Sequence, residues 1–552
     1  MLRKSSVLLT ALIVFSLIVS PAGTAQAATA ASTNNYEPDN TPGQAKLIAS
    51  GVPQTHSIVP STDLDWVKFQ LTTTSGVLLE TSGTLNSDTR ISLYTSNLTP
   101  IEYHDDTATS FWSYIDRTCG VDPLPAGTYY VKVEEYLNNA QIPSYNIAFD
   151  ASPCPAEFLN IYMGSDRQGS SLLAPHTSIR RSLPGVSSGP VQVVNTGSSP
   201  MMLSERTIYT VNGVQTSFAE MMALPDSNLD DTYWLPWYNN TGLDTQLRIA
   251  NVSGATATVQ VFIGGVPMGA PFSLTAGASV RKSYRGVNNG PVRIASSQKI
   301  VAAERVIYTV NGVQTSFTEM MALPATQLDT IYWLPWYNQV GLDTELRIAN
   351  ITTTQATIHV YIGGVEMQGS PFNLAGGATA RRSYAGVNNG PVKIVSDQLI
   401  VAAERVIYKV NGIQTSFTEM MALPNNQLRK TYWMPWYNYN GTLDTQLRIA
   451  NVSEALATVR VYIGGVQMVD SPFTLGVGAS TRRSYFGINN GPVQIVSDQP
   501  IVAAERFIYK VNNVPTSFSE MMGLPDQQLG LTYWLPWYNS LGLDTQLRIG
   551  LP

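Results

Sequence analysis

The sequence has few charged residues, few histidines and almost no cysteine. Of its 552 residues only 13% are charged, and there are four His and two Cys. So small a supply of metal ligands and thiols argues against a multi-metal or thiol-based catalyst. The formal net charge of −6 contains no basic excess, which argues against nucleic acid or an anionic membrane surface as the partner.

Catalytic signatures are also scarce. The sequence holds no His-Glu-x-x-His, Walker-type phosphate loop or Cys-x-x-Cys, and His56, His104, His176 and His359 fall at unrelated places. A pair of carboxylates that hydrolyses glycosidic bonds remains an alternative, because two such residues need only lie close together in the folded protein. We therefore expect a protein that is not an enzyme.

What the chain does contain is turn residues and apolar residues. Hydrophobic residues make up 44%, and there are 42 Gly and 33 Pro, so turns are frequent and many short strands are favoured over long helices. With so few charged residues, the solvent-exposed surface must be made polar largely by Asn, Gln, Ser, Thr and Tyr, as is common in proteins outside cells.

One apolar run stands out, at the start of the chain. Arg3 and Lys4 precede the run over 7–19, and the small-residue stretch Ala25-Gln26-Ala27 follows. This order is typical of a secretory signal peptide covering 1–27, and the run is shorter than the roughly 20 residues of a spanning helix. A retained N-terminal anchor is the alternative. We expect a mature chain that is secreted or at the cell surface, without a transmembrane segment.

The two cysteines, Cys119 and Cys154, both lie early in the mature chain. An oxidising compartment favours a disulfide between them. Such a bridge stabilises a domain by roughly 4 kcal/mol in the chain-entropy account. Two free buried thiols are the alternative.

The region 32–152 alternates short β-type runs with turn residues. Period-2 patterning at this spacing predicts an antiparallel sandwich. The runs are 66–71, 77–81, 89–94, 127–134 and 145–149.

Four motifs in this region carry a resemblance. They are Glu37-Pro38-Asp39-Asn40-Thr41-Pro42, Asp63-Leu64-Asp65-Trp66-Val67-Lys68-Phe69, Asp88-Thr89 and Gly127-Thr128-Tyr129-Tyr130-Val131. In this order they resemble the bacterial pre-peptidase C-terminal (PPC) domain. That resemblance implies a secreted jelly-roll-like sandwich that accompanies extracellular peptidases and is not itself the catalyst.

The resemblance also implies a Ca²⁺ site, since some relatives bind calcium through these acidic segments. Clustered carboxylates and amides supply the hard oxygens that Ca²⁺ prefers. However, the family usually reads Glu-Pro-Asn-Asp where this chain reads Glu-Pro-Asp-Asn. The alternative is that Asp39 and Asp63 only cap turns. The candidate ligands are Glu37, Asp39, Asn40, Asp63 and Asp65.

The rest of the chain is one module written four times. Glu-Arg pairs begin at 205, 304, 404 and 505, in steps of 99, 100 and 101 residues. A period near 100 is too long for a solenoid repeat or one propeller blade and suits an immunoglobulin-like sandwich. We place the modules at 158–256, 257–355, 356–455 and 456–552. A fully extended row of them would span on the order of 150 Å.

Local signals within each module favour strands. Asn311-Gly312 accepts the backbone of a two-residue hairpin turn. Ser316 and Glu319 form a capping box before Met320-Met321-Ala322-Leu323, which predicts a short helical turn stopped by Pro324. The box recurs at Ser217/Glu220, Ser416/Glu419 and Ser517/Glu520.

The most distinctive segment is Tyr233-Trp234-Leu235-Pro236-Trp237-Tyr238-Asn239, repeated from 332, 432 and 533. In a strand, Trp234, Pro236 and Tyr238 share one face, and Pro236 predicts an edge strand. Either that face packs on the next module or it is an aromatic platform for sugar rings. The candidate ligand-binding residues are Trp234, Tyr238, Trp333, Tyr337, Trp433, Tyr437, Trp534 and Tyr538.

The recurring Glu-Arg neighbours point to opposite faces of a strand, so Glu304 and Arg305 cannot pair with each other. We expect a structural network in which one of them pairs with Asp343 or Arg347.

The repeats are similar to tandem sandwich repeats of secreted bacterial surface proteins. The similarity lies in the order Trp-x-Pro, Asp-Thr-x-Leu-x-Ile-Ala-Asn and Ile-Val-Ala-Ala-Glu-Arg-x-Ile-Tyr. Together the patterns predict an all-β protein: a jelly-roll-like sandwich followed by four immunoglobulin-like modules, each with a short helical turn. We expect it to mediate adhesion or self-association, because tandem copies raise valency. The alternatives are binding of extracellular polysaccharide through the aromatic strands and an accessory role in a secreted hydrolase or peptidase system.

Overall fold

The computed structural model describes most of the chain after the predicted export signal, and residues 1–27 lie outside the described part. The described stretches are 34–83, 87–106, 111–119, 122–154, 157–211, 214–310, 313–410, 413–511 and 514–552. Their regular structure is β strand apart from five three-residue 3-10 helices. Among these stretches no helix has the length and apolar character needed to cross a bilayer.

The N-terminal domain is a sandwich of two antiparallel-rich sheets, as the alternating runs predict. One sheet has the order β1-β3-β8-β5-β6 and the other β2-β9-β4-β7. Phe69, Leu79 and Val131 lie fully buried between them. A disulfide joins Cys119 to Cys154, which confirms the predicted pairing. The strands are β1 (Lys46–Leu47), β2 (Gln54–Ile58), β3 (Asp65–Leu71), β4 (Ser75–Gly83), β5 (Thr89–Thr95), β6 (Pro100–His104), β7 (Tyr114–Arg117), β8 (Gly127–Glu135) and β9 (Ile142–Pro153).

Each later unit is a two-layered sandwich held together by one long strand, and unit 2 shows the pattern. The first half of β26 pairs with β21 and β18 in one layer, and its second half pairs with β20 and β27 in the other. The strands are β18 (Asp230–Leu235), β19 (Tyr238–Asn239), β20 (Asp244–Asn251), β21 (Ala257–Ile263), β22 (Val266–Pro267), β23 (Phe272–Leu274), β24 (Ser279–Lys282), β25 (Asn288–Asn289), β26 (Val292–Val310), β27 (Val313–Met321) and β28 (Leu323–Pro324).

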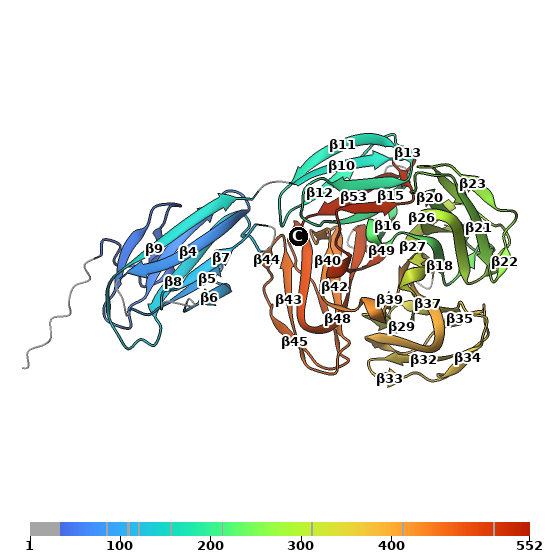
Figure 1. The fold of residues 1–552 in the computed structure, drawn as a ribbon. Helices are drawn as coiled ribbons and strands as arrows, with labels where there is room; N and C mark the ends of the chain where they lie inside the picture. Colours follow the sequence, from blue (N-terminus) through green and yellow to red (C-terminus); the bar gives the residue numbers. More distant parts are fainter. Residues whose placement is uncertain are drawn as a thin grey trace, which may run out of the picture.

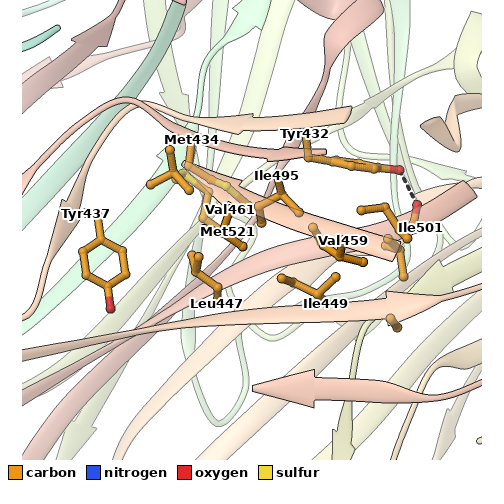
Figure 2. Close-up of a cluster of buried hydrophobic side chains, with 14 of the residues drawn as sticks. Tyr432, Met434, Tyr437, Leu447, Ile449, Val459, Val461, Ile495, Ile501 and Met521 are labelled. Carbon is orange, nitrogen blue, oxygen red and sulfur yellow. Dashed lines mark hydrogen bonds between the residues drawn. The ribbon is translucent and has the colours of Figure 1, made fainter. Parts of the chain in front are cut away.

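The core of each unit comes from the alternating apolar residues of these strands. Figure 2 shows unit 4, where Val459, Val461 and Ile495 pack into the core from two neighbouring, hydrogen-bonded strands. Tyr432 lies among them without exposed surface, and its hydroxyl donates to the Ile501 carbonyl at 2.8 Å. The buried tyrosine hydroxyl is therefore satisfied, as a buried polar group must be.

The hydrogen bonding divides the repeats at places other than those predicted. Units 2, 3 and 4 run over 230–324, 329–424 and 429–525, with a 3-10 helix at each connection. The predicted boundaries at 256/257, 355/356 and 455/456 therefore fall inside units, between strands of one sandwich. A sequence period fixes the length of a repeat but not its starting point, and here the strand pairing fixes that point.

Unit 1 is built from both ends of the repeat region. β53 (Asp544–Gly550) lies between β12 (Ser178–Ser182) and β15 (Met202–Val211), and β51 (Thr532–Leu535) pairs with β14 (Val191–Asn195). Figure 1 shows the red C-terminal strand among the cyan and green strands of unit 1. The four units thus form a closed ring and not an extended row. The remaining strands of unit 1 are β10 (Glu157–Met163), β11 (Asp166–Leu173), β13 (Ser187–Ser188), β16 (Val214–Met222), β17 (Leu224–Pro225) and β52 (Tyr538–Asn539).

The axis of the ring is lined by one strand from each unit: β16, β27, β38 (Ile413–Met421) and β49 (Val514–Met522). Ser316 on β27 lies 3.4 Å from the Ser416 hydroxyl and accepts a hydrogen bond from the Phe417 amide at 3.4 Å. The same contacts link the other neighbours, and Phe218 closes the circle by donating to Ser517. The axial serines are Ser217, Ser316, Ser416 and Ser517.

These serines are the ones assigned above to a capping box, so that assignment is wrong. Ser316 and Glu319 lie in the extended strand β27, not at the start of a helix. The short helical turn of the unit follows Pro324, over Ala325–Gln327. Pairing with β26 on one side and burial at the axis outweigh the local capping preference. The hairpin between β26 and β27 is present, whereas its predicted turn, Asn311-Gly312, lies outside the described residues.

Candidate functional site

Four of the predicted calcium ligands come together in the N-terminal domain, around the start of β3. Glu37, Asp63 and Asp65 place carboxylate oxygens within 4.8 Å of one another. Asp39 joins Asp65 in a second, overlapping group of the same size, whose third member is His56. Asp39, Asp65 and His56 have no exposed surface. The acidic motifs, 24 to 28 residues apart in sequence, therefore meet at one buried point.

The geometry of this cluster leaves several buried oxygens without a hydrogen-bond donor. Within the described residues neither oxygen of Asp39 accepts a hydrogen bond, and the same holds for Oδ1 of Asp65. The imidazole Nδ1 of His56 lies 3.1 Å from Oδ2 of Asp39. Asp65 Oδ2 accepts one hydrogen bond, from the Tyr145 hydroxyl at 2.6 Å. Buried carboxylates without donors are costly unless a cation neutralises them.

Electrostatics agree with this view of the cluster. Burial raises the pKa of Asp65 to about 9, although the Tyr145 hydrogen bond acts in the opposite direction. Repulsion by Asp39, Asp63 and Glu37 adds to the rise. Burial also raises the pKa of Glu37, followed by repulsion from Asp39 and Asp63. A bound divalent cation would reverse these shifts because it favours the ionised carboxylates.

Asn40 has a different role from that of the carboxylates. Its Oδ1 accepts a hydrogen bond from the Leu64 amide at 3.3 Å, so this side chain fastens the acidic N-terminal segment to the turn before β3. Asp63 also caps this turn, accepting from the Val59 amide at 3.3 Å and from Leu64 at 3.1 Å. The turn-capping alternative therefore describes Asn40 and part of Asp63, but not Asp39.

His56 is the member of the cluster that sequence reasoning missed. It lies on β2 opposite Tyr145 of β9, and its ring stacks on Tyr36 at 4.7 Å between centroids. No spacing in the sequence connects His56 with Asp39 or Asp65, so only the pairing of β2 with β9 brings it there. The oxygen-rich group Glu37, Asp63 and Asp65 fits Ca²⁺, which the four carboxylates would hold. An ion bound there would tie the N-terminal segment to the sandwich.

The aromatic segments of the ring are arranged differently from the predicted continuous strand. β18 ends at Leu235, and Tyr238 begins the separate strand β19. The break at Pro236 reverses the alternation, so Tyr238 points into the core of its own unit instead of lying beside Trp234. β18 is also not an edge strand, because the short β28 pairs with its outer side. All four tyrosines of the predicted platform are buried in this way: Tyr238, Tyr337, Tyr437 and Tyr538.

The tryptophans of the predicted platform pack into the neighbouring unit. Trp333 of unit 3 is 8% exposed and belongs to the core of unit 4, and its indole nitrogen donates to Asn425, in the 3-10 helix that connects the two units, at 2.9 Å. Trp433 enters the core of unit 1 and Trp534 that of unit 2. Trp234 packs against the core of unit 3. The predicted junction contact is thus present, and these residues do not form a sugar-binding platform.

The second tryptophan of each segment also contacts the next unit. The Arg347 guanidinium of unit 3 lies 4.6 Å from the centroid of the Trp237 ring of unit 2. The Trp237 nitrogen donates to Asn288 in its own unit at 2.8 Å. Equivalent arginine contacts complete the circle at Trp336, Trp436 and Trp537. Both indoles of the repeated motif therefore join neighbouring units of the ring.

The recurring arginines form a buried belt of ion pairs. Arg305 binds Glu319 across the β26–β27 hairpin, with Nη2 and Nε at 2.5 and 2.7 Å from Oε1. The same pair recurs in the other units as Arg206–Glu220, Arg405–Glu419 and Arg506–Glu520. The predicted pairing of Arg305 with Asp343 is thus wrong, whereas the charge of the other predicted partner, Arg347, does act on Glu304. The partner of Arg305 is the glutamate that the capping-box pattern had placed on a helix.

The neighbouring glutamate faces the next unit instead. Burial raises the pKa of Glu304 well above its usual range, and repulsion by Glu419 of unit 3 adds to this. Arg405 and Arg347 of unit 3 act in the opposite direction. Burial likewise raises the pKa of the equivalent residues Glu205, Glu404 and Glu505. These groups are enclosed between units, beside the buried belt of ion pairs.

A Gly-x-Ser-x-Gly pattern occurs once, at Gly185–Gly189, and its structure does not fit a nucleophile elbow. That elbow needs a sharp turn from strand to helix. Here Ser187 and Ser188 form the two-residue strand β13, paired with β52. They occupy the place that Asn288-Asn289 holds in unit 2.

Comparison of the sequence with protein-family models gave no match, and comparison with curated proteins gave none either. Among solved structures, the chain is similar to the pre-peptidase C-terminal domain of a collagenase from Bacillus anthracis. The identity is 15% and the TM-score 0.17, over 20% of this chain and 100% of that one.

Two longer likenesses were also found. One is to the arabinofuranosyltransferase AftD from Mycobacteria, with 10% identity and TM-score 0.14 over 84% of this chain and 41% of that one. The other is to a glycoside hydrolase family 32 protein from Bifidobacterium adolescentis, with 9% identity and TM-score 0.11 over 88% and 97%. Because all these TM-scores lie below 0.5, none of the likenesses establishes a fold or a function for this chain.

Proposed function

We propose that the protein is an extracellular, non-catalytic surface or matrix protein that mediates adhesion or self-association. The export-type start of the sequence and the disulfide support an extracellular location. The low charge and the polar, uncharged surface residues agree with it. The N-terminal domain then serves as an accessory sandwich, and the closed ring as the rigid body that presents contact surfaces.

The observation that carries the proposal is a basic pair repeated on every unit, with its first residue exposed in all four. In unit 2 the pair is Arg281-Lys282 on β24, and β24 lies at the far end of the layer β27–β26–β20–β24 from the axis. Lys282 is held over the Phe272 ring, 3.9 Å from its centroid. The four pairs are Arg180-Arg181, Arg281-Lys282, Arg381-Arg382 and Arg482-Arg483.

A closed ring fixes these four pairs on its rim at equivalent places. Each contact is individually weak because an exposed ion pair contributes little. Four contacts on one rigid body raise the overall affinity through effective concentration. The chain as a whole is acidic, with a net charge of −6, so a second copy offers complementary charge to the basic rim. This arrangement suits attachment and self-association better than turnover.

The test compares two double charge reversals in the full mature chain. Arg281→Glu/Arg482→Glu alters the repeated rim, and Lys299→Glu/Lys430→Glu alters two exposed lysines outside it by the same charge. Sedimentation velocity measures self-association, and retention on carboxylate-coated beads measures adhesion, both at low and high salt. We expect at least one of these to fall about tenfold in the rim variant only, since it would remove two of four linked contacts.

Three results would contradict the proposal. The first is that the native chain neither self-associates nor is retained on the beads at low salt. The second is that both double variants lose the same amount of association and retention. The third is that the purified chain hydrolyses casein or glycans, which would indicate the competing hydrolase function.

A further inference from the structure

The four junctions between units of the ring are equivalent in sequence but differ in what fills them. At the two junctions that flank unit 4, a notch lies between a Trp, a Tyr and a Gly of one unit and a turn of the next. In unit 3 these residues are Trp333, Tyr361 and Gly364, and the facing turn is Val477-Gly478 of unit 4. In unit 4 they are Trp433, Tyr462 and Gly465, facing Pro175-His176 of unit 1.

At the junction between units 4 and 1, the notch is occupied by the N-terminal domain. Pro125 packs so closely on Gly465 that an added Cβ there would lie 2.5 Å from the proline ring. The His176 imidazole hydrogen-bonds to the backbone of Pro123. Thr74 donates to the Pro175 carbonyl at 3.2 Å. Figure 1 shows the blue N-terminal domain beside β44 (Val466–Gln467), at this junction.

The segment that fills this notch is Asp122-Pro123-Leu124-Pro125. All four residues line the remaining space there together with Trp433 and Tyr462. Aromatic-lined grooves accept proline-bearing segments in many complexes, because an extended proline segment is already ordered before it binds. The chain thus shows, within itself, which chemistry this notch accepts.

The junction between units 1 and 2 is closed by the ring itself, because Gly164 lies against the Gly277 carbonyl, 3.0 Å from an added Cβ. Between units 2 and 3, the Arg293 guanidinium covers the Phe262 ring at 4.1 Å and lies 5.9 Å from the Trp234 ring, and nothing lies within 4 Å of a Cβ added to Gly265.

The junction between units 3 and 4 is open. Its notch is a cavity of about 430 Å³ lined by Trp333, Tyr361, Gly364, Lys393 and the Val477 turn. Nothing lies within 4 Å of a Cβ added to Gly364, in contrast to Gly465. The volume lies within the range of small-ligand and peptide pockets. Lys393 stands where unit 4 has Gln494 and lies 5.1 Å from the centroid of the Trp333 ring, and Glu454 also lines the notch.

We propose that the open cavity between units 3 and 4 binds an extended, proline-bearing segment of a partner protein. The prolines would pack on Trp333, Tyr361 and Gly364, as Pro125 packs on Gly465 at the neighbouring junction. An acidic residue beside them would meet Lys393. This inference rests on the proposed function, because it names the partner of a binding protein.

The experiment uses the full mature chain and a fluorescein-labelled peptide with the sequence of residues 122–127, Asp-Pro-Leu-Pro-Ala-Gly. Fluorescence anisotropy measures binding of this peptide and of a control peptide with both prolines replaced by alanine. Val477→Trp fills the cavity from an exposed position. Ala276→Trp places the same side chain on the equivalent exposed turn of unit 2 and serves as the matched control.

We expect the proline peptide to bind at least tenfold more tightly than the alanine peptide. Val477→Trp and Tyr361→Ala should each weaken it about tenfold, and Ala276→Trp should leave it unchanged. Equal binding of both peptides, no binding up to millimolar peptide, or equal effects of the two tryptophan variants would overturn the proposal. If the peptide does not bind while the native chain still self-associates or is retained on the beads, only this inference is contradicted. If the peptide does not bind and the native chain neither self-associates nor is retained, the proposed function is contradicted too.

Discussion

Closure of the ring by β53 makes a prediction about residues far apart in sequence. Ile549 lies in β53, has no exposed surface and pairs with Ile179 on one side and Leu203 on the other. Ile549→Ala removes buried carbon atoms from the core of unit 1. Core substitutions of this type cost about 2–5 kcal/mol. A whole domain is stabilised by only about 5–15 kcal/mol, so the loss is large for this unit.

The effect should appear in unit 1, more than 300 residues before the substitution. Every 1.4 kcal/mol is a factor of ten, so opening of the strands next to β53 should become about 30-fold more frequent or more. Hydrogen exchange read by mass spectrometry measures this opening as lost protection over 178–182 and 202–208. Urea unfolding gives the total loss.

Ile449→Ala is the matched control. Ile449 is the equivalent residue of unit 4, is equally buried and pairs with strands of its own unit. It should cost a similar free energy while leaving 178–182 and 202–208 protected. If Ile549→Ala instead changes protection only near the C-terminus, the closed ring is wrong and the units are separately folded.

Three further predictions follow from the contacts between parts. Trp333→Ala should lower the free energy of unfolding by about 3–5 kcal/mol in urea, against about 1 kcal/mol or less for the half-buried Trp336→Ala, and equal losses would contradict the inter-unit core. Burial lowers the pKa of His176 to about 4, so the neutral imidazole favours docking of the N-terminal domain above the ordinary pKa of 6.5. That contribution, about 3 kcal/mol at most, is lost as the pH falls towards 4. Small-angle scattering should show the domain separating there, and His176→Gly should flatten the pH response. Calcium at a hundred times its dissociation constant should stabilise the N-terminal domain by about 2.7 kcal/mol in calorimetry and leave the ring transition unchanged, whereas Asp39→Asn should abolish the gain.

Local patterns in the sequence predicted the elements that depend on neighbouring residues. The alternation of apolar and polar residues predicted the strands of the N-terminal domain and of the units. The period near 100 residues predicted the number of units. The acidic motifs at Glu37, Asp39, Asp63 and Asp65 also meet as their resemblance implied. His56 completes the cluster through pairing of β2 with β9, which no sequence spacing indicates.

The predictions that the structure contradicts have a common physical cause, which is burial of side chains against residues distant in sequence. Ser316 to Glu319 matched a helix cap, but the axis of the ring and the ion pair with Arg305 hold them in a strand. The sequence left a platform open beside the favoured junction for Trp333, because an aromatic side chain is stabilised by burial in either. Only the packing of Trp333 into the core of unit 4 decided between them.

By itself, the sequence determined that this protein is a β-rich chain with one sandwich and four copies of a second kind. Those properties follow from residue alternation, turn chemistry and repetition, which act over a few neighbouring residues. The tertiary structure alone decided that the copies close into a ring, since β53 gains two strand partners only by returning to unit 1. Closure also decided which repeated side chains are enclosed between units and which remain on the rim.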